Sequence, residues 1–184
     1  CGRAWAQGEP VIPAPAPLVA DGAWAGVMTS HPRLLGPPEW LRGLASEKPE
    51  AYAEVKSHSG DNLLAAGVVR AIEGLDPAQA RPYIDRAIAH LEKGVTTLHQ
   101  DTWLWLTDVA LTYDLFHDAI APEDRVRMVE WLNGHLAEYT TDENAFHNST
   151  LSKVLCYLRI AYATQGENPR AGEFRDYALR TLYE

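Results

Sequence analysis

Apolar residues recur at helical spacing from His31 to the end of the chain, and no segment shows the strict alternation of a half-buried strand. The pattern predicts seven helices, and prolines or capping residues mark their starts. These helices are expected at 39–56 after Pro37-Pro38, after Asp61, after Asp76-Pro77, at 102–116 after Asp101, from Pro122, near His147, and after Asn168-Pro169. The fold class predicted from this pattern is all-α.

The predicted helices differ in kind. The third and fifth are amphipathic, whereas the fourth (102–116) and sixth (150–163) are apolar nearly all round. A helix that is apolar nearly all round must be covered on every side. We therefore expect odd-numbered helices to be outer and even-numbered helices to be inner. Antiparallel helical hairpins with alternating inner and outer members build an (α/α) toroid, here an incomplete one.

This alternation separates the loops into two sets. The N-termini of the inner helices share one end of the molecule, where the loops 57–61, 97–101 and 140–148 carry polar and titratable residues. The opposite end collects the short, proline-marked turns 74–77, 118–122 and 166–169. Because longer polar loops carry function more often than tight turns, the first end is the expected functional face and the second is expected to be structural.

The segment 145–150 holds the strongest candidates for chemistry. His147 lies four residues before Leu151, and Asn148 lies seven before Leu155, on the line of the expected buried face of the sixth helix. A histidine can act as a base or neutralise a carboxylate, and an asparagine can donate to one. The alternative is that Asn148 caps the helix while His147 packs at its end.

Weaker candidates lie at the same end. His99 and Gln100 could line a cleft, and the aromatic rings of Trp103 and Phe146 could stack on sugars, although aromatic residues more commonly belong to a core. Asp108 and Asp114 lie on different faces of the fourth helix, so each is expected to bond a neighbouring helix or loop. Cys156 is expected to be a small buried residue.

Composition narrows the possible functions. The 184 residues include 16 Lys+Arg and 25 Asp+Glu, which gives a net charge of −9. This acidic balance argues against general nucleic-acid binding. Two cysteines are too few for a disulfide scaffold, no zinc-ligand spacing is present, and no apolar run is long enough to cross a membrane.

Residues 1–30 differ from the rest of the chain because they are rich in proline and alanine. Their prolines prevent the formation of a helix. Cys1 followed by Gly2 resembles the start of a mature bacterial lipoprotein, with a lipid anchor at Cys1 and residues 1–30 as a linker or tether. That interpretation implies a periplasmic, outer-membrane or cell-surface protein, or otherwise a secreted one. The alternative is an arbitrary start. Residues 31–184 form the expected helical domain, and its last ten residues stop inside a helical pattern, which suggests truncation.

Three segments of this domain carry a family resemblance. HPRLLGPPEWLRGL (31–44), DVALTYDLFHDAIAPEDRVRMVEWL (108–132) and FHNSTLSKVLCYLRIAYATQGENPRAGEFRDYAL (146–179) resemble, in this order, parts of the toroid domain of heparinase II/III-like and alginate-lyase-like polysaccharide lyases. The family often has an asparagine before the active-site histidine, whereas this chain has Asn148 after His147.

The resemblance implies a bacterial lyase that cleaves acidic, uronate-containing polysaccharides by β-elimination. His147 and Asn148 would neutralise the uronate carboxylate or act as the base. The family's catalytic tyrosine and its C-terminal β-sandwich domain have no counterpart before Glu184, so we expect no activity from this chain alone and no cofactor in this portion.

Two other classes of function stay open. One is a glycoside hydrolase on the same kind of toroid, which needs a carboxylic acid at the functional end. The candidates for that acid are Asp61, Asp101, Asp142 and Glu143. The other is a non-catalytic helical module that binds carbohydrate or protein.

Overall fold

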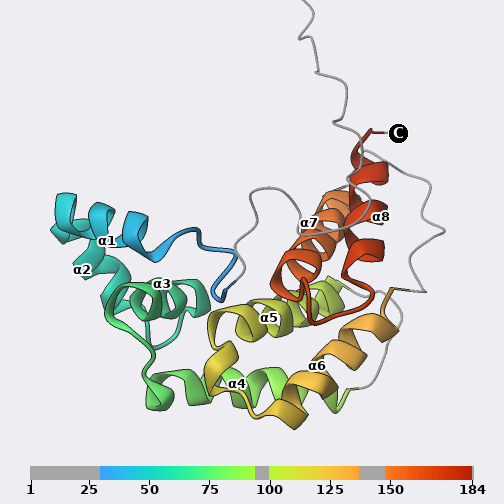
Figure 1. Cartoon of the computed structure of the whole chain (residues 1–184), viewed down its shortest axis with the longest axis horizontal. Helices are drawn as coiled ribbons and strands as arrows, with labels where there is room; N and C mark the ends of the chain where they lie inside the picture. Colours follow the sequence, from blue (N-terminus) through green and yellow to red (C-terminus); the bar gives the residue numbers. More distant parts are fainter. Residues whose placement is uncertain (1–29, 94–99, 137–147, 184) are drawn as a thin grey trace, which may run out of the picture.

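The computed structural model describes residues 30–93, 100–136 and 148–183, and within these ranges the chain is helical with no β-strand, as predicted (Figure 1). The elements are α1 (Pro38–Glu47), α2 (Pro49–Ser57), α3 (Leu63–Glu73), α4 (Pro77–Leu91), α5 (Gln100–Leu115), the short 3-10 helix η1 (His117–Ala119), α6 (Pro122–Gly134), α7 (Asn148–Ala163) and α8 (Ala171–Tyr183).

The prediction of one continuous helix over 39–56 is wrong, because α1 ends at Glu47 and α2 begins at Pro49. Lys48 between them adopts φ −133° and ψ 65°, outside the helical region. Proline has no amide hydrogen and disfavours helical backbone in the residue before it. Pro49 therefore ends α1 and serves as the first residue of α2, where a missing hydrogen-bond donor does no harm.

The predicted caps are partly right. Asp76 caps α4 by accepting a hydrogen bond from the Ala78 amide at 2.9 Å. Asn62, and not Asp61, caps α3 by accepting from the Ala65 amide. Because α5 begins at Gln100, Asp101 lies inside the helix and is not its cap. The start of α8 is two residues later than predicted, since Asn168 and Pro169 form the turn before it.

Helix α5 is the centre of the fold and contacts α3, α4, α6 and α7. Figure 1 shows the helices in an open, curved arrangement, with α1 to α3 at one end and the antiparallel pair α7 and α8 at the other. The C-terminal ends of α3, α5 and α7 lie together, because Arg70 of α3 pairs with Asp118 after α5, and His117 contacts Glu167 after α7. These three helices are the second, fourth and sixth of the sequence prediction, which were expected to run in a common direction, and their joined C-terminal ends agree with that.

The expectation that the fourth and sixth predicted helices are covered on every side is wrong for the described residues. Leu104 of α5 is 63% exposed, and Leu151 and Leu155 of α7 are 51% and 52% exposed. The opposite sides of these helices are fully packed, with Leu106, Val109, Tyr157 and Ile160 buried. Each helix therefore has one buried side and one apolar side that faces solvent.

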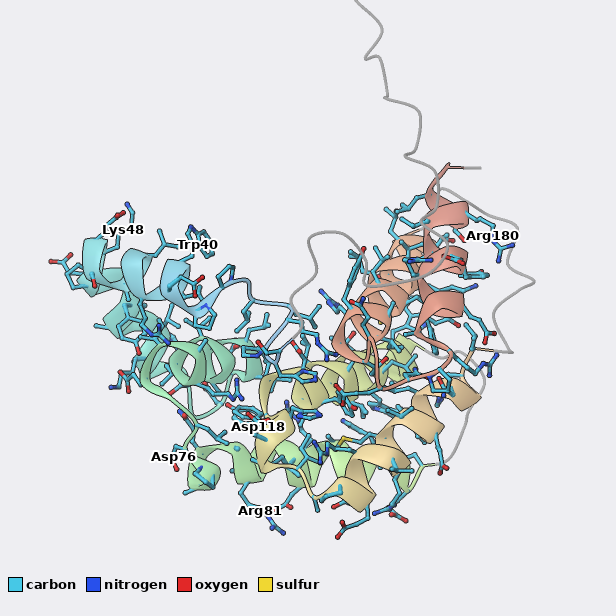
Figure 2. The ribbon with its side chains drawn as sticks, in the orientation of Figure 1. Trp40, Lys48, Asp76, Arg81, Asp118 and Arg180 are labelled. Carbon is cyan, nitrogen blue, oxygen red and sulfur yellow. The ribbon has the colours of Figure 1, made fainter. Side chains whose placement is uncertain are left out.

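The α1–α2 pair is the least packed part of the fold. Neither helix contributes a buried residue. An open apolar hollow of about 240 Å³ lies between the pair and α3, which also touch each other, and its lining includes Leu41, Leu44, Tyr52, Val55 and Ile72. Figure 2 shows Trp40 on the surface of α1 and Lys48 at the junction of α1 and α2. In the described part of the chain, no helix combines the length and apolar character needed to span a membrane.

Candidate functional site

Most of the residues predicted to form the functional end lie outside the part of the chain that the structure describes. This applies to His99, Phe146 and His147, and to the side chains of Gln100 and Asn148, the first residues of α5 and α7. Trp103 is described, and it packs half-buried against the core. Its buried indole Nε1 has no hydrogen-bond partner in the part of the chain that the structure describes.

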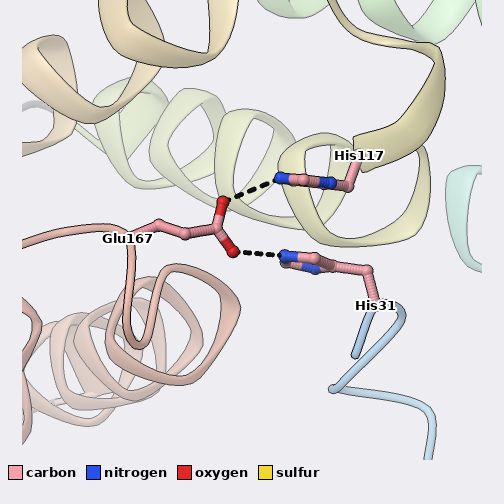
Figure 3. Close-up of side chains that lie close together, drawn as sticks. All are labelled: His31, His117 and Glu167. Carbon is pink, nitrogen blue, oxygen red and sulfur yellow. Dashed lines mark hydrogen bonds and ion pairs between the residues drawn. The ribbon is translucent and has the colours of Figure 1, made fainter. Parts of the chain in front are cut away.

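The densest polar cluster of the described residues lies at the opposite end, beside the proline-marked turns. It joins three segments that are remote in sequence: the stretch 30–36 before α1, the end of α5 with η1, and the turn between α7 and α8. Figure 3 shows its central trio, in which His31 and His117 both approach the carboxylate of Glu167. We call the cluster of His31, Arg33, Tyr113, Asp114, His117 and Glu167 the interlock.

Asp114 is the fully buried anchor of the interlock. Its carboxylate accepts hydrogen bonds from the backbone amides of Arg33 and Leu34 at 2.9 to 3.0 Å, and from Nδ1 of His31 at 2.6 Å. A buried carboxylate is stable only when its charge is matched and its lone pairs are used. The stretch 30–36 supplies these partners, so Asp114 fixes the path of the chain before α1, as the sequence predicted for a structural role.

Glu167 is the second anchor and accepts four hydrogen bonds. His31 Nε2 and Arg33 Nη2 donate to Oε1 at 2.9 Å each, while Tyr113 Oη and His117 Nε2 donate to Oε2 at 2.6 and 2.7 Å. Burial alone would raise the pKa of Glu167, but the hydrogen bonds from Tyr113, His31 and His117 outweigh it and lower the pKa to about 2. Burial and the contact with Glu167 raise the pKa of Tyr113. Glu167 is therefore a charged acceptor at neutral pH, not an acid that could donate a proton.

The two histidines of the interlock stack on each other. Their ring centroids are 4.0 Å apart and the ring planes differ by 10°. Both nitrogens of His31 face carboxylate oxygens, and only a doubly protonated imidazole donates to both. Arg125 of α6 lies against His117, with Nη1 at 3.0 Å from Nε2 and 3.3 Å from Nδ1. The site is a network of alternating charges.

The interlock also contains the one group of described residues that could hold a metal ion. His31, His117 and Glu167 offer ligand atoms that all lie within 4.8 Å of one another. However, Nε2 of each histidine already donates to Glu167, so neither nitrogen has a lone pair free for a metal ion. Both oxygens of Glu167 are already occupied by donors, and Arg33 adds a positive charge. The geometry favours a structural ion-pair network over a metal centre.

The remaining residues singled out from the sequence have structural partners. Asp108 bonds Arg86 and His90 of α4 at 2.9 and 3.3 Å, as expected for a carboxylate that joins two helices. Cys156 is buried, as predicted, and its thiol lies 3.0 Å from Thr107 Oγ1. Burial raises the pKa of this thiol. Neither residue offers a reactive group to solvent.

Sequence reasoning missed His31, Arg33, His117 and Glu167 because they lie outside the α-helices, in three connecting segments that are remote in sequence. Nothing local in the sequence shows that these segments meet. One available signal was that all four lie within the three segments that carry the family resemblance, close to a tight turn or a proline.

Comparison with known proteins found no family model, no curated protein and no solved structure that matches this chain.

Proposed function

We propose that this chain is the N-terminal part of the (α/α) toroid of a polysaccharide lyase, which cleaves uronic-acid-containing polysaccharide by β-elimination. The observation that carries the proposal is the interlock. The three segments that resemble the lyase family (31–44, 108–132 and 146–179) each contribute at least one residue to it: His31 and Arg33, then Tyr113, Asp114 and His117, then Glu167. Motifs that meet in space support a shared fold more strongly than motifs that only occur in order.

The helix arrangement supports the same proposal. The C-terminal ends of α3, α5 and α7 are joined by side-chain contacts, so their N-terminal ends point to the other side of the fold. Helix α7 is 16 residues long, which places its first residues roughly 24 Å from the interlock. The proposed catalytic end is thus separated from the end that stabilises the fold.

In the proposed reaction, His147 and Asn148 act on the uronate sugar. One neutralises its carboxylate, which acidifies the C5 proton, and a base removes that proton. Electrons move into a new C4–C5 double bond while the C4–O bond breaks and the leaving oxygen is protonated. The tyrosine and the β-sandwich domain expected to complete the site lie outside this chain, so the chain alone is inactive. A periplasmic or cell-surface location, with a possible lipid at Cys1, fits a substrate of this size.

The test assays the complete gene product for unsaturated uronate ends, which absorb in the ultraviolet, with alginate, heparan-type glycans and polygalacturonate as substrates. His147→Ala and Asn148→Ala should each lower turnover by about 10²-fold or more. The control is Asp85→Ala, because Asp85 is an exposed side chain in the middle of α4 that pairs with Arg81.

Four results would contradict the proposal. Equal activity in the control and the two variants would remove His147 and Asn148 from the site. Saturated reducing ends would indicate a glycoside hydrolase, and binding without turnover would indicate a non-catalytic module. Product from the isolated 184-residue chain would contradict its expected inactivity.

A further inference from the structure

Arg159 is a half-buried cation on α7 that has no carboxylate partner among the described residues. Its one hydrogen bond runs from Nη1 to Thr107 Oγ1 of α5 at 3.4 Å, which is longer than a strong N–H···O bond. A guanidinium withdrawn from water needs an acceptor to offset lost hydration. Arg159 therefore has unused donor capacity on the seam between α5 and α7.

Three other arginines with well-buried side chains have carboxylate partners, whereas the half-buried Arg125 contacts His117. Arg33 pairs with Glu167 at 2.9 Å, Arg70 with Asp118 at 3.0 Å, and Arg175 with Asp176 at 2.7 Å. The chain carries a net charge of −9, so acidic side chains are plentiful. Within the described residues, Arg159 thus lacks the kind of partner that Arg33, Arg70 and Arg175 have.

The surroundings of Arg159 supply few acceptors. Asp108, the carboxylate next to Thr107 in sequence, is engaged by Arg86 of α4 at 2.9 Å. One turn earlier on α5, the indole N–H of Trp103 meets no acceptor within the described ranges. Cys156 lies between these positions, 3.0 Å from Thr107 Oγ1 and 3.3 Å from the Trp103 carbonyl oxygen. The seam is rich in donors and poor in acceptors, which suits an acceptor-rich, anionic ligand.

The position of Arg159 relates it to the proposed catalytic end. Residues 148, 155 and 159 are separated by seven and four positions, so they fall on one side of α7. Leu155 on that side is 52% exposed, which shows that the side is open to solvent. Eleven residues of helix separate 148 from 159, a rise of roughly 16 Å. A chain molecule lying along α7 can contact both ends of this stretch.

We propose that Arg159 binds the carboxylate of an acidic sugar unit at a subsite remote from the cleaved bond. The inference rests on the proposed function for its ligand class, a uronate oligosaccharide. Arginine suits this role because its planar fork matches the geometry of a carboxylate.

The experiment measures binding of tetrasaccharides of galacturonate, mannuronate and guluronate to the 184-residue chain by calorimetry, each beside its methyl ester. The acidic form of at least one should bind, and Arg159→Gln should weaken that binding by about three- to tenfold. Binding of the methyl ester should not change, because it carries no charge. Arg159→Lys, which keeps the charge but not the fork, should give an intermediate loss.

The matched control is Arg180→Gln, since Arg180 is an exposed arginine of α8 whose one hydrogen bond is to a backbone oxygen (Figure 2). Circular dichroism on each variant checks that the fold is kept. The inference is overturned if no acidic tetrasaccharide binds the wild-type chain, if Arg159→Gln binds as wild type does, or if the ester loses as much affinity as the acid.

The lyase proposal can fail separately. Loss of acid binding in Arg159→Gln, together with a complete gene product that makes no unsaturated ends, would keep the subsite and reject the lyase. Unsaturated product with unchanged binding in Arg159→Gln would keep the lyase and reject the subsite.

Discussion

Replacing Asp114 with alanine tests whether the interlock holds the domain together. The substitution removes a fully buried carboxylate and leaves the amides of Arg33 and Leu34 and Nδ1 of His31 without their acceptor. An unsatisfied buried donor costs about 1–3 kcal/mol, and breaking a buried ion pair costs about 3–5 kcal/mol. Because these donors share one carboxylate, we take about 4 kcal/mol as the expected loss of unfolding free energy.

The assay is thermal and urea unfolding followed by circular dichroism. For a chain of this size, 1 kcal/mol shifts the Tm by about 2–4 °C, so Asp114→Ala should lower the Tm by about 8–16 °C. Asp85→Ala is the matched control, because Asp85 is an exposed aspartate paired only with Arg81 on α4. Its loss should stay within about 0.5 kcal/mol. A loss below about 1 kcal/mol for Asp114→Ala would refute the idea that the interlock stabilises the fold.

Two further predictions follow from particular contacts. The folded pKa of Glu167 is lowered to about 2 from 4.5, so its charge stabilises the fold above pH 4.5 and this contribution is lost as the pH falls toward 2. Glu167→Gln should flatten that part of the stability curve in acid unfolding experiments, and an unchanged slope would contradict the argument. Gly67→Ala should destabilise the fold by about 1–3 kcal/mol despite the better helix propensity of alanine, because the new Cβ would lie 2.6 Å from Leu115 Cδ1. A stabilised variant in urea unfolding would show that Leu115 moves aside easily.

Local sequence signals predicted most helices but not their packing. The spacing around Pro77 and Pro122 gave the starts of α4 and α6, because proline and its neighbours act within one turn. Pro49 was overlooked as a break, although the same rule applies to it. The solvent-facing side of α7 could not be predicted, since apolar periodicity does not show whether Leu151 and Leu155 meet a partner.

The interlock was harder to predict for a different reason. His31 meets Asp114 across 83 positions and Glu167 across 136 positions, and no periodicity within a helix encodes such pairings. Only the structural roles of Asp108 and Asp114 followed from the sequence, because a carboxylate in a mostly apolar helix must bond a neighbour. Their partners came from the fold.

The α1–α2 pair is expected to have a lower local stability than the rest of the domain. Neither helix buries a residue, and the pair is held to α3 by exposed polar contacts such as those of Tyr52 and Lys56 with Glu73, beside an apolar hollow. The interlock holds the chain before α1, and the packed helix α3 holds it after α2, so the segment between them can open as a tethered loop. Such a loop is a separate cooperative unit in hydrogen exchange, with amides that exchange well before those of α5. Proteases and partner proteins would therefore meet an opened form of this edge while the rest of the domain stays folded.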